Sequence, residues 1–358
     1  MNEQMMFFEH RKEPSNDWKW TFADYPEEKN GLKVFSCFAC GGGSTMGYKL
    51  AGCEVIGCVE IDKRLNELYV KNHSPKHNFC MDIRAFNDIT DSELPKELFE
   101  LDILDGSPPC TTFSMSGKRE ETWGQKKKFR EGQTEQTLDD LSFVFLETVN
   151  KLKPKFFIME NVEGFLKGEA WGYVQRIYSH AKAIGYTVKH YLCKGENMGV
   201  PQTRHRVFFI AYRNDIEFDF DNLDMFFDYE PVIYGDVKSG KGFEISEGSM
   251  LLKIIKKAKY PQRNIGNTYI AQGEKKRNFN DVYAWECDVC PTFLAKANVY
   301  RVSECCKLSK EDILSVSTFP QDYAFKNNTH VEIGYVCGMS VPPVMIKRIV
   351  GRILEVLK

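Results

Sequence analysis

The sequence lacks long apolar runs, and this absence limits the class of protein that it encodes. No stretch of about 18 apolar residues occurs, so we expect no membrane-spanning helix. The first 19 residues are polar and mixed in charge, without the apolar centre of a secretory signal peptide. Internal repeats and low-complexity tracts are also missing. A length of 358 residues then predicts a soluble, cytoplasmic chain with one large domain and one smaller domain.

The chain also lacks a strong net charge and a disulfide framework. Its formal net charge is −2, so the chain as a whole does not indicate a polyanionic partner. Its twelve cysteines follow no paired spacing, which favours reduced thiols in a cytoplasmic setting. Cys287 and Cys290 have a spacing that suits zinc, but the adjacent Cys305 and Cys306 make an awkward second pair, and we expect no metal.

What is present is an alternation of short β-type runs and helical patterns that starts near residue 32. We expect strands at 32–38, 54–61, 101–105, 156–159, 187–192 and 207–212. We expect helices at 45–50, 63–72, 138–152, 173–184, 309–316 and 342–357. This order predicts an α/β fold with a doubly wound, mostly parallel, Rossmann-like sheet covered on both faces. After residue 213 the helical periods fade, which predicts a second, smaller, irregular domain.

A glycine-rich turn follows the first expected strand. Glycines at such a turn let a nucleotide approach the backbone near a helix N-terminus. The turn does not spell Gly-x-Gly-x-x-Gly, which disfavours a dinucleotide dehydrogenase. Three glycines also follow its Cys-x-x-Cys spacing, which disfavours a redox pair. The residues of the turn are Phe38, Ala39, Cys40, Gly41, Gly42 and Gly43.

Two acids lie where a nucleotide would need them. Glu60 ends the second expected strand, where its carboxylate would accept hydrogen bonds from two ribose hydroxyls. Asp82 is similarly placed for an adenine amino group. Asp62 and Asp82 also suit helix caps, so a structural role for these acids stays open.

The most informative segment is Gly106-Ser107-Pro108-Pro109-Cys110, which follows an apolar run of strand type. Two prolines restrict the backbone before the cysteine, so the thiol is held in one place on a loop. Thiolate is the reactive form of cysteine, and a partly exposed, electropositive position suits a nucleophile. The pattern therefore predicts that Cys110 is a nucleophile, with a chance proline turn as the alternative.

Six basic residues follow this cysteine closely. Such a run is typical of a solvated face, but a basic loop beside a reactive thiol also suits a phosphate backbone. We therefore expect nucleic-acid contacts from Lys118, Arg119, Lys126, Lys127, Lys128 and Arg130.

These motifs, in this order, resemble those of the cytosine-C5 DNA methyltransferase family. The match continues with Glu160-Asn161-Val162 and with Gln202-Thr203-Arg204-His205-Arg206. It ends with Leu308-Ser309, Phe319-Pro320, Tyr323 and the closing segment Gly338-Met339-Ser340-Val341-Pro342-Pro343. An ordered set of this kind is far more specific than any single motif.

The resemblance implies a mechanism and its catalytic residues. Cys110 would add to carbon 6 of a flipped cytosine in double-stranded DNA, so that carbon 5 accepts a methyl group from S-adenosylmethionine. Glu160 would hold ring nitrogen 3 and the exocyclic amine. Arg204 and Arg206, two apart on an extended segment, would point to the same side and reach the base carbonyl and the backbone. The basic loop after Cys110 would close over the flipped base.

The resemblance also implies a cofactor site and a division of the chain. Residues 31–213 and 328–358 would form the catalytic domain, 214–327 a target recognition domain, and 1–30 an N-terminal extension. We expect a monomer, and leave open whether a cognate restriction endonuclease accompanies it. In addition to the glycine turn and Glu60, the cofactor would contact Ile61, Asp82, Ile83, Pro109, Leu141, Ser340 and Val341.

The chain departs from the family pattern at three positions. It has Cys40 where the family usually has glycine, Thr111 where it has glutamine, and Met339 where it has asparagine. The last change puts a contact near the methionine end of the cofactor in doubt. None of the three departures replaces Cys110, Glu160 or the paired arginines, so we expect an active enzyme.

Three alternative functions remain. An exocyclic-amine methyltransferase shares the fold but has an aromatic residue where this chain has Cys110, which opposes that chemistry. The tRNA-methylating branch shares the Pro-Pro-Cys and Glu-Asn-Val elements, although the long variable region better suits a reader of duplex DNA. A DNA-binding module without chemistry is the third, and it would lose nothing on replacement of Cys110 by alanine.

Overall fold

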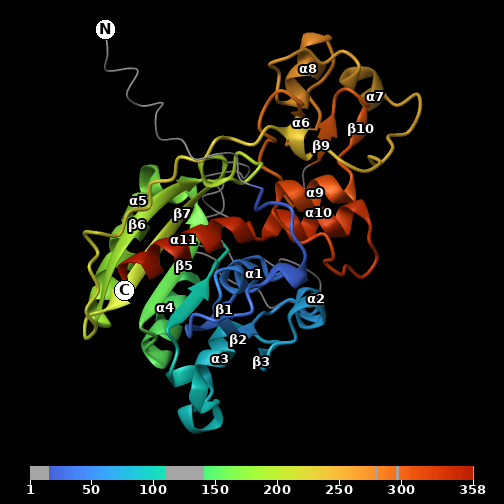
Figure 1. Cartoon of the computed structure of the whole chain (residues 1–358). Coiled ribbons are helices and arrows are strands. Elements are labelled where there is room, and N and C mark those ends of the chain that lie inside the picture. The colour runs from blue at the N-terminus through green and yellow to red at the C-terminus, as the bar shows by residue number, and fades with distance from the viewer. Residues whose placement is uncertain (1–15, 110–140, 279, 296–297, 358) are drawn as a thin grey trace. The chain divides into compact units, whose positions relative to one another are not determined.

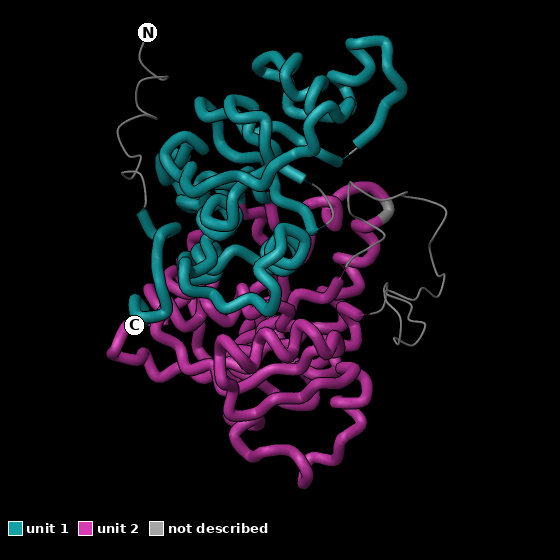
Figure 2. The backbone as a smooth tube through the Cα atoms, turned by 90° about the vertical axis from the view of Figure 1, so that its right-hand side faces the viewer, with its two compact units in different colours: residues 1–25, 194–204, 226–348 teal, residues 26–193, 205–225, 349–358 magenta. Residues whose placement is uncertain are grey.

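The computed structural model of the chain describes residues 16–109, 141–278, 280–295 and 298–357. The chain divides into two compact units, which Figure 2 shows in different colours. The large-sheet unit comprises residues 26–193, 205–225 and 349–358. The small-sheet unit comprises residues 1–25, 194–204 and 226–348.

The large-sheet unit contains a seven-stranded sheet in the order β3-β2-β1-β4-β5-β7-β6 (Figure 1). Strands β1 to β5 pair in parallel, and β7 runs antiparallel to β5. The expected α/β, doubly wound, mostly parallel sheet is thus confirmed. The strands are β1 Lys33–Cys37, β2 Glu54–Val59, β3 His77–Phe79, β4 Ile103–Gly106, β5 Phe156–Val162, β6 Tyr186–Lys194 and β7 His205–Arg213.

Helices cover this sheet between the strands. Asp62 caps the helix that follows β2, because its carboxylate accepts a hydrogen bond from the amide of Arg64. This confirms the alternative prediction that Asp62 is a helix cap. The helices are α1 Gly43–Leu50, α2 Lys63–His73, α3 Ile83–Asp88, α4 Leu141–Leu152 and α5 Trp171–Ala183.

Strand alternation sorts the side chains of the sheet onto two faces. Phe35, Leu104, Phe157 and Phe209 share one core cluster with buried residues of α3, α4 and α5. On each strand, the residues that alternate with these point to the other face of the sheet. We call it the α1 face, because Tyr48 of α1 donates a hydrogen bond to Asp105 on that face. The α1 face carries polar residues along one edge of the sheet. Ser36, Asp105 and Glu160 lie towards the carboxyl ends of β1, β4 and β5, and Arg206 lies at the amino end of the antiparallel β7.

The order of the strands identifies the ligand-binding edge of the sheet. Strands β1 and β4 are neighbours, and the chain leads from β1 to one side of the sheet and from β4 to the other. In such sheets ligands bind at the carboxyl ends of the strands beside this switch point. Cys37 and Gly106, the last residues of β1 and β4, are register partners. The glycine turn and the segment that leads to Cys110 therefore leave the sheet side by side.

The small-sheet unit is more regular than the sequence indicated. A three-stranded sheet in the order β10-β9-β8 packs with helices whose periods are too short to stand out in the sequence. Part of the expected N-terminal extension belongs to this unit, since Trp20 is buried and donates a hydrogen bond to the carbonyl of Thr318. The elements are α6 Tyr234–Val237, α7 Met250–Ile255, α8 Ile265–Ala271, β8 Val282–Ala284, β9 Val299–Arg301, β10 Cys306–Lys307, α9 Lys310–Val316 and α10 His330–Met339.

The last helix, α11 Pro343–Val356, begins in the small-sheet unit and ends in the large-sheet unit. Together with α10 it forms a stretch, His330–Val356, that is long and apolar enough to cross a membrane. Of its most apolar window, 78% is buried inside the protein, as in a core helix.

Candidate active site

The glycine turn after β1 has a strained backbone that explains its composition. Phe38, Cys40 and Gly42 have φ angles of 56°, 49° and 85°, in the left-handed region that favours glycine. A Cβ atom on Gly42 would lie 2.0 Å from Nε2 of His73, the buried last residue of α2. That nitrogen lies 3.2 Å from the carbonyl oxygen of Gly41. His73 therefore supports the turn from beneath and requires glycine at position 42.

Glu60 is tied to this turn. It is buried, and its carboxylate accepts the amide N–H of Cys40 at 2.8 Å and that of Asp62 at 2.8 Å. Burial raises the pKa of this carboxyl above its usual value, and the two amides oppose the rise. Each carboxylate oxygen has a second lone pair, so the group retains acceptor capacity for ribose hydroxyls.

The other residues expected around an adenosine lie near the carboxyl ends of β1 to β4. Asp82 caps α3, accepting the amide N–H of Arg84 at 2.9 Å. Ile83 and Leu141 are buried in the core cluster against which Phe38 packs. All three side chains therefore belong to, or pack against, one core cluster, and their contact with adenine remains a prediction. Ala39, by contrast, is buried on the other side of the turn with Cys58 and Tyr69.

Glu160 and Arg206 form a buried ion pair on the α1 face. Nε of Arg206 lies 2.6 Å from Oε1 of Glu160, and the side chains are only 13% and 11% exposed. Antiparallel pairing places Glu160 opposite Phe208, two residues from Arg206 on the same face of β7. Arg206 also donates to the carbonyl of His205 at 2.7 Å. A carboxylate held in this way can meet the polar edge of a base inserted at the carboxyl end of β5.

Arg204 belongs to the small-sheet unit. It is buried in the small-sheet unit, where its guanidinium donates to the carbonyls of Phe293 and Gly338 at 3.2 Å. Strand β7 begins only at His205, so strand geometry does not establish that Arg204 and Arg206 point to one side, and that expectation remains a prediction. Strand alternation does not extend back to residue 204, whose amide donates to the carbonyl of Gln202. The catalytic role of Arg204 remains a prediction.

The closing segment of the family pattern lies at the end of α10 in the small-sheet unit. Ser340 and Val341 are buried, and the Ser340 hydroxyl donates to the carbonyl of Val336 at 2.8 Å. Met339 is 46% exposed, so its replacement of the family's asparagine alters a surface position. Whether Ser340 and Val341 contact the cofactor remains a prediction.

Several expected site residues fall outside the described part of the chain. The nucleophile Cys110, the variant Thr111 and the basic residues of 118–130 are among them. Pro109 is the last described residue before this gap, and it lies half-buried where the segment leaves β4.

The four cysteines considered for zinc lie in the small-sheet unit. Cys290 and Cys306 are buried, Cys305 is half-buried and Cys287 is exposed, and all four are free thiols. No cluster of three or more metal-binding side chains occurs among the residues that the structure describes. The absence of zinc from the protein remains a prediction.

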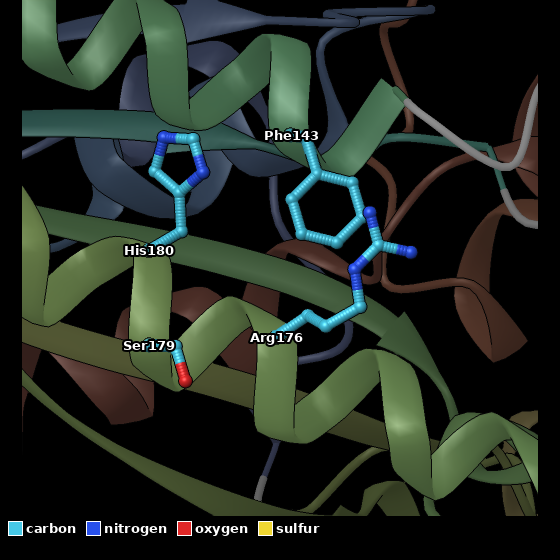
Figure 3. Close-up of a pocket in the computed structure, with 4 residues that line it drawn as sticks. All are labelled: Phe143, Arg176, Ser179 and His180. Carbon is cyan, nitrogen blue, oxygen red and sulfur yellow. The ribbon is translucent and has the colours of Figure 1, made fainter.

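A surface pocket of about 530 Å³ lies between α4 and α5 (Figure 3). The Arg176 guanidinium lies 4.4 Å from the centre of the Phe143 ring, with Ser179 and His180 beside them. Both helices cover the face of the sheet opposite to the α1 face. We therefore assign this pocket no part in catalysis.

The sequence did not reveal the contacts that three further residues make. Gln202 is buried and joins two segments of the small-sheet unit, donating to the carbonyl of Val316 and accepting the amide of Phe293, each at 2.9 Å. His73 supports the glycine turn, and Asp105 is a carboxyl buried beside Ser36 and Tyr48. Gln202 gave a signal as the first residue of its motif, and Asp105 gave one as an acid within an otherwise apolar strand, whereas His73 gave none.

Comparison with known proteins identifies the family. The family model described as C-5 cytosine-specific DNA methylase matches residues 32–355. Relatives include Type II methyltransferase M.NgoPII of Neisseria gonorrhoeae, 31% identical, and M.FnuDI of Fusobacterium nucleatum, 32% identical. These alignments cover 54% and 52% of this chain and 52% and 48% of the relatives, so the chain spans about half their length. M1.HphI of Haemophilus parahaemolyticus is 23% identical over 90% of this chain and 87% of its own.

Solved structures share the fold. A protein encoded within an E. coli prophage, described as a candidate DNA modification methyltransferase, has a TM-score of 0.67 and 18% identity over 91% of this chain and 99% of its own. The Spodoptera frugiperda DNMT2 mutant has a TM-score of 0.60 and 16% identity over 91% and 100%. The family model matches most of the chain, including every strand of the large sheet, the glycine turn and the Glu160–Arg206 pair. This chain therefore belongs to the C-5 cytosine-specific DNA methylase family.

Proposed function

We propose that the chain is a DNA (cytosine-5)-methyltransferase, which transfers a methyl group from S-adenosylmethionine to carbon 5 of a flipped cytosine in a specific duplex sequence. The observation that carries this proposal is the buried Glu160–Arg206 pair at the carboxyl end of β5. Strands β5 and β7, which carry the pair, belong to the same sheet as β1 and β4. The glycine turn follows β1 in the sequence, and the Pro-Pro-Cys segment follows β4. A nucleoside donor and a target base would thus meet at one edge of the sheet.

The residues near β1 to β3 suit S-adenosylmethionine. Phe38, Ile83 and Leu141 would contact the adenine, and Glu60 would accept hydrogen bonds from the ribose hydroxyls. Three consecutive glycines, Gly41 to Gly43, carry no side chains, so a ligand could approach the backbone of the turn closely. We propose the same group of contacts for Ile61, Asp82, Ser340 and Val341. Bound S-adenosylmethionine supplies an electrophilic methyl group on sulfur.

The residues on the α1 face would activate the base. Cys110 is the proposed nucleophile: its thiolate forms a bond to carbon 6, which makes carbon 5 electron-rich enough to take the methyl group. Glu160 would contact ring nitrogen 3 and the exocyclic amine, stabilising the charge that develops as sulfur adds. Arg206 holds Glu160 in place and would reach the base carbonyl. Removal of the carbon 5 proton by a base then allows the bond between sulfur and carbon 6 to break, which releases Cys110.

A second surface suits the DNA backbone. Between residues 253 and 277 the chain has eight basic residues and one acid, Glu274. These residues lie on and beside α7 and α8, which a core of Ile254, Ile255, Ile265 and Tyr269 holds together. The dense positive charge favours phosphate contacts, which set affinity and salt dependence. The exposed basic side chains are Lys253, Lys256, Lys257, Lys259, Arg263, Lys275, Lys276 and Arg277.

Neutralising part of this basic surface should weaken DNA binding without changing the methylated sequence. In the double variant Lys253→Gln/Lys256→Gln we expect the Kd for duplex DNA to rise. The slope of log K against log salt should become shallower by about 1 to 2, since each lost phosphate contact removes about 0.9. Fluorescence anisotropy at several salt concentrations measures both quantities. Sequencing of methylated DNA would show the same target site, because phosphate contacts carry no sequence information.

Lys96→Gln/Lys182→Gln is the matched control. Both lysines are exposed, and they lie near the amino ends of the strands, on the segment before β4 and at the end of α5. This variant should keep the Kd and salt slope of the wild-type chain. An equal loss in both double variants would show that only total charge matters, and would contradict a phosphate contact at α7 and α8.

The remaining expectations also belong to this proposal. We propose double-stranded DNA as the partner, a monomeric enzyme and a cytoplasmic location. Residues 31–213 with 328–358 would act in catalysis and 214–327 in target recognition. The basic residues of 118–130 would contact DNA near the flipped base.

Bisulfite sequencing of DNA from cells that express the chain tests the activity. The proposal predicts conversion-resistant cytosines within one recurring sequence, and their loss in the Cys110→Ala variant. Unmodified DNA together with methylated tRNA would reassign the enzyme to RNA. If the wild-type and Cys110→Ala chains both bind DNA and neither methylates it, the protein would be a DNA-binding module without catalytic activity.

A further inference from the structure

Asp105 is a carboxyl group buried between the two segments that carry the proposed chemistry. It is 2% exposed and lies on β4, five residues before Cys110. The mechanism above gives it no role. An acid buried in a strand of Leu and Ile costs free energy unless its oxygens receive hydrogen bonds. Its partners therefore indicate what the group does.

Both oxygens of Asp105 accept hydrogen bonds from the elements that build the cofactor turn. The hydroxyl of Ser36, its register partner on β1, donates to Oδ2 at 2.7 Å. The hydroxyl of Tyr48, on α1, donates to Oδ1 at 3.2 Å. Ser36 lies two residues before the first residue of the turn, and α1 begins at its last residue, Gly43. One carboxyl group thus joins both ends of the glycine turn to the strand that leads to the nucleophile.

We propose that Asp105 is a positioning residue that holds the cofactor turn and α1 in place against the strand carrying the nucleophile. The inference rests on the proposed function, since it concerns the same site. It assigns Asp105 no contact with substrate or cofactor. Its effect passes through Ser36 and Tyr48 to the backbone of the turn.

The electrostatics of the site make the hydrogen bonds between Asp105, Ser36 and Tyr48 sensitive to pH. Burial raises the pKa of Asp105 to about 7, hydrogen bonds from Ser36 and Tyr48 oppose the rise, and the charge of Glu160 adds to it. Only the ionised carboxylate accepts from both hydroxyls without having to donate a proton itself. The titratable groups that face it are Cys37 on β1, Tyr48 on α1, Tyr69 on α2 and Glu160 on β5.

The sign of the pH effect follows from this shift. The folded pKa is raised from 3.8 to about 7, so the contribution of Asp105 to stability is present below about pH 4 and is lost as the pH rises towards 7. Cofactor affinity should change in the opposite direction. Ionised Asp105 accepts both hydrogen bonds and holds the turn more firmly. Its negative charge also favours the positively charged sulfonium group of S-adenosylmethionine. Wild-type affinity for S-adenosylmethionine should therefore rise between pH 6 and pH 8, relative to a variant that cannot ionise.

The test compares S-adenosylmethionine binding, measured by isothermal titration calorimetry without DNA, in wild-type, Asp105→Asn, Asp105→Leu and Tyr48→Phe chains. We expect Asp105→Leu to weaken binding about tenfold, or about 1.4 kcal/mol, and Tyr48→Phe about threefold. Asp105→Asn should differ from the wild type in how its Kd varies from pH 6 to pH 8. This comparison cancels the titration of the ligand itself. Asp105→Asn keeps the size and polarity of the side chain, and Tyr48→Phe removes only the hydroxyl that donates to Asp105, so the test does not depend on Asp105→Leu folding.

Asp102→Asn provides the matched control. Asp102 is also buried, directly before the first residue of β4, where it accepts the amide of Lys33 at 2.8 Å and lies 2.7 Å from Nζ of Lys155. This variant should lower the melting temperature and leave the Kd unchanged. If the Asp105 and Tyr48 variants lose stability but keep the wild-type Kd and its pH dependence, Asp105 is merely structural and the inference fails. If the wild-type chain itself does not bind S-adenosylmethionine, the proposed function fails first.

Discussion

Glu160→Gln should lower the rate of methyl transfer to DNA by about 10² to 10⁴, the range expected when a positioned acid–base group is lost. The amide keeps the size of the side chain but cannot balance the charge of Arg206, whose Nε lies 2.6 Å from the carboxylate. It also cannot stabilise the base as sulfur adds to carbon 6. Single-turnover transfer of a radiolabelled methyl group to duplex DNA measures this rate. The Kd for S-adenosylmethionine should stay within about twofold.

Glu163→Gln is the control for this prediction. Glu163 is three residues further along the chain and pairs with Lys167 at 2.6 Å and with His205 at 3.2 Å, at 30% exposure. These pairs lie near the surface, so their loss should leave the transfer rate unchanged. A Glu160→Gln enzyme that retains more than about a tenth of the wild-type rate would remove Glu160 from the mechanism.

Arg301→Met should destabilise the small-sheet unit by about 3–5 kcal/mol, the usual result of removing one partner from a buried ion pair. Arg301 is 1% exposed, and its guanidinium lies 2.7 Å from Asp312, which is fully buried. It also donates to Glu304 at 2.8 Å and to the carbonyl of Gly240 at 3.1 Å. Methionine fills part of the volume but leaves Asp312 as an uncompensated charge. Urea unfolding followed by circular dichroism measures the loss.

Two further variants separate burial from charge. Lys241→Met breaks an ion pair with Glu244 in which both side chains are largely exposed, and it should leave the midpoint of unfolding unchanged. Arg301→Met combined with Asp312→Leu removes both charges and should recover part of the stability. Full recovery is not expected, since Asp312 also caps α9 through Ser309. A loss below about 1 kcal/mol in Arg301→Met would mean that water reaches Asp312.

The strand and helix order of the large-sheet unit was predictable because local patterns specify it. Strands such as β4 and β5 are buried on both faces and read as apolar runs, and amphipathic helices lie between them. The antiparallel direction of β7 was not predictable, because an apolar strand has the same pattern in either direction. Helix α10 was missed for a different reason. Gly334 and Gly338 disfavour a helix locally, but both are needed where α10 packs closely on residues 293–295.

The site was predictable where chemistry demands a residue type, and unpredictable where packing does. Glu60, Glu160 and Arg206 were found from their motifs, and the structure places each at a carboxyl or amino end of a strand in the large sheet. The partners of Arg204 and Gln202 depend on segments about 90 residues away, which no local pattern reports. His73 acts through its shape beneath Gly42, and only the three-dimensional structure shows that contact.

Covalent capture of the chain on DNA tests the central claim most directly. A mixed-sequence duplex in which 5-fluorocytosine replaces cytosine would be incubated with the protein and S-adenosylmethionine, because fluorine at carbon 5 blocks release of the enzyme. We expect a protein–DNA complex that survives denaturing electrophoresis, requires S-adenosylmethionine and is absent from the Cys110→Ser variant. A wild-type chain that methylates cytosine but is never captured, or a Cys110→Ser chain that is captured equally, would contradict the account.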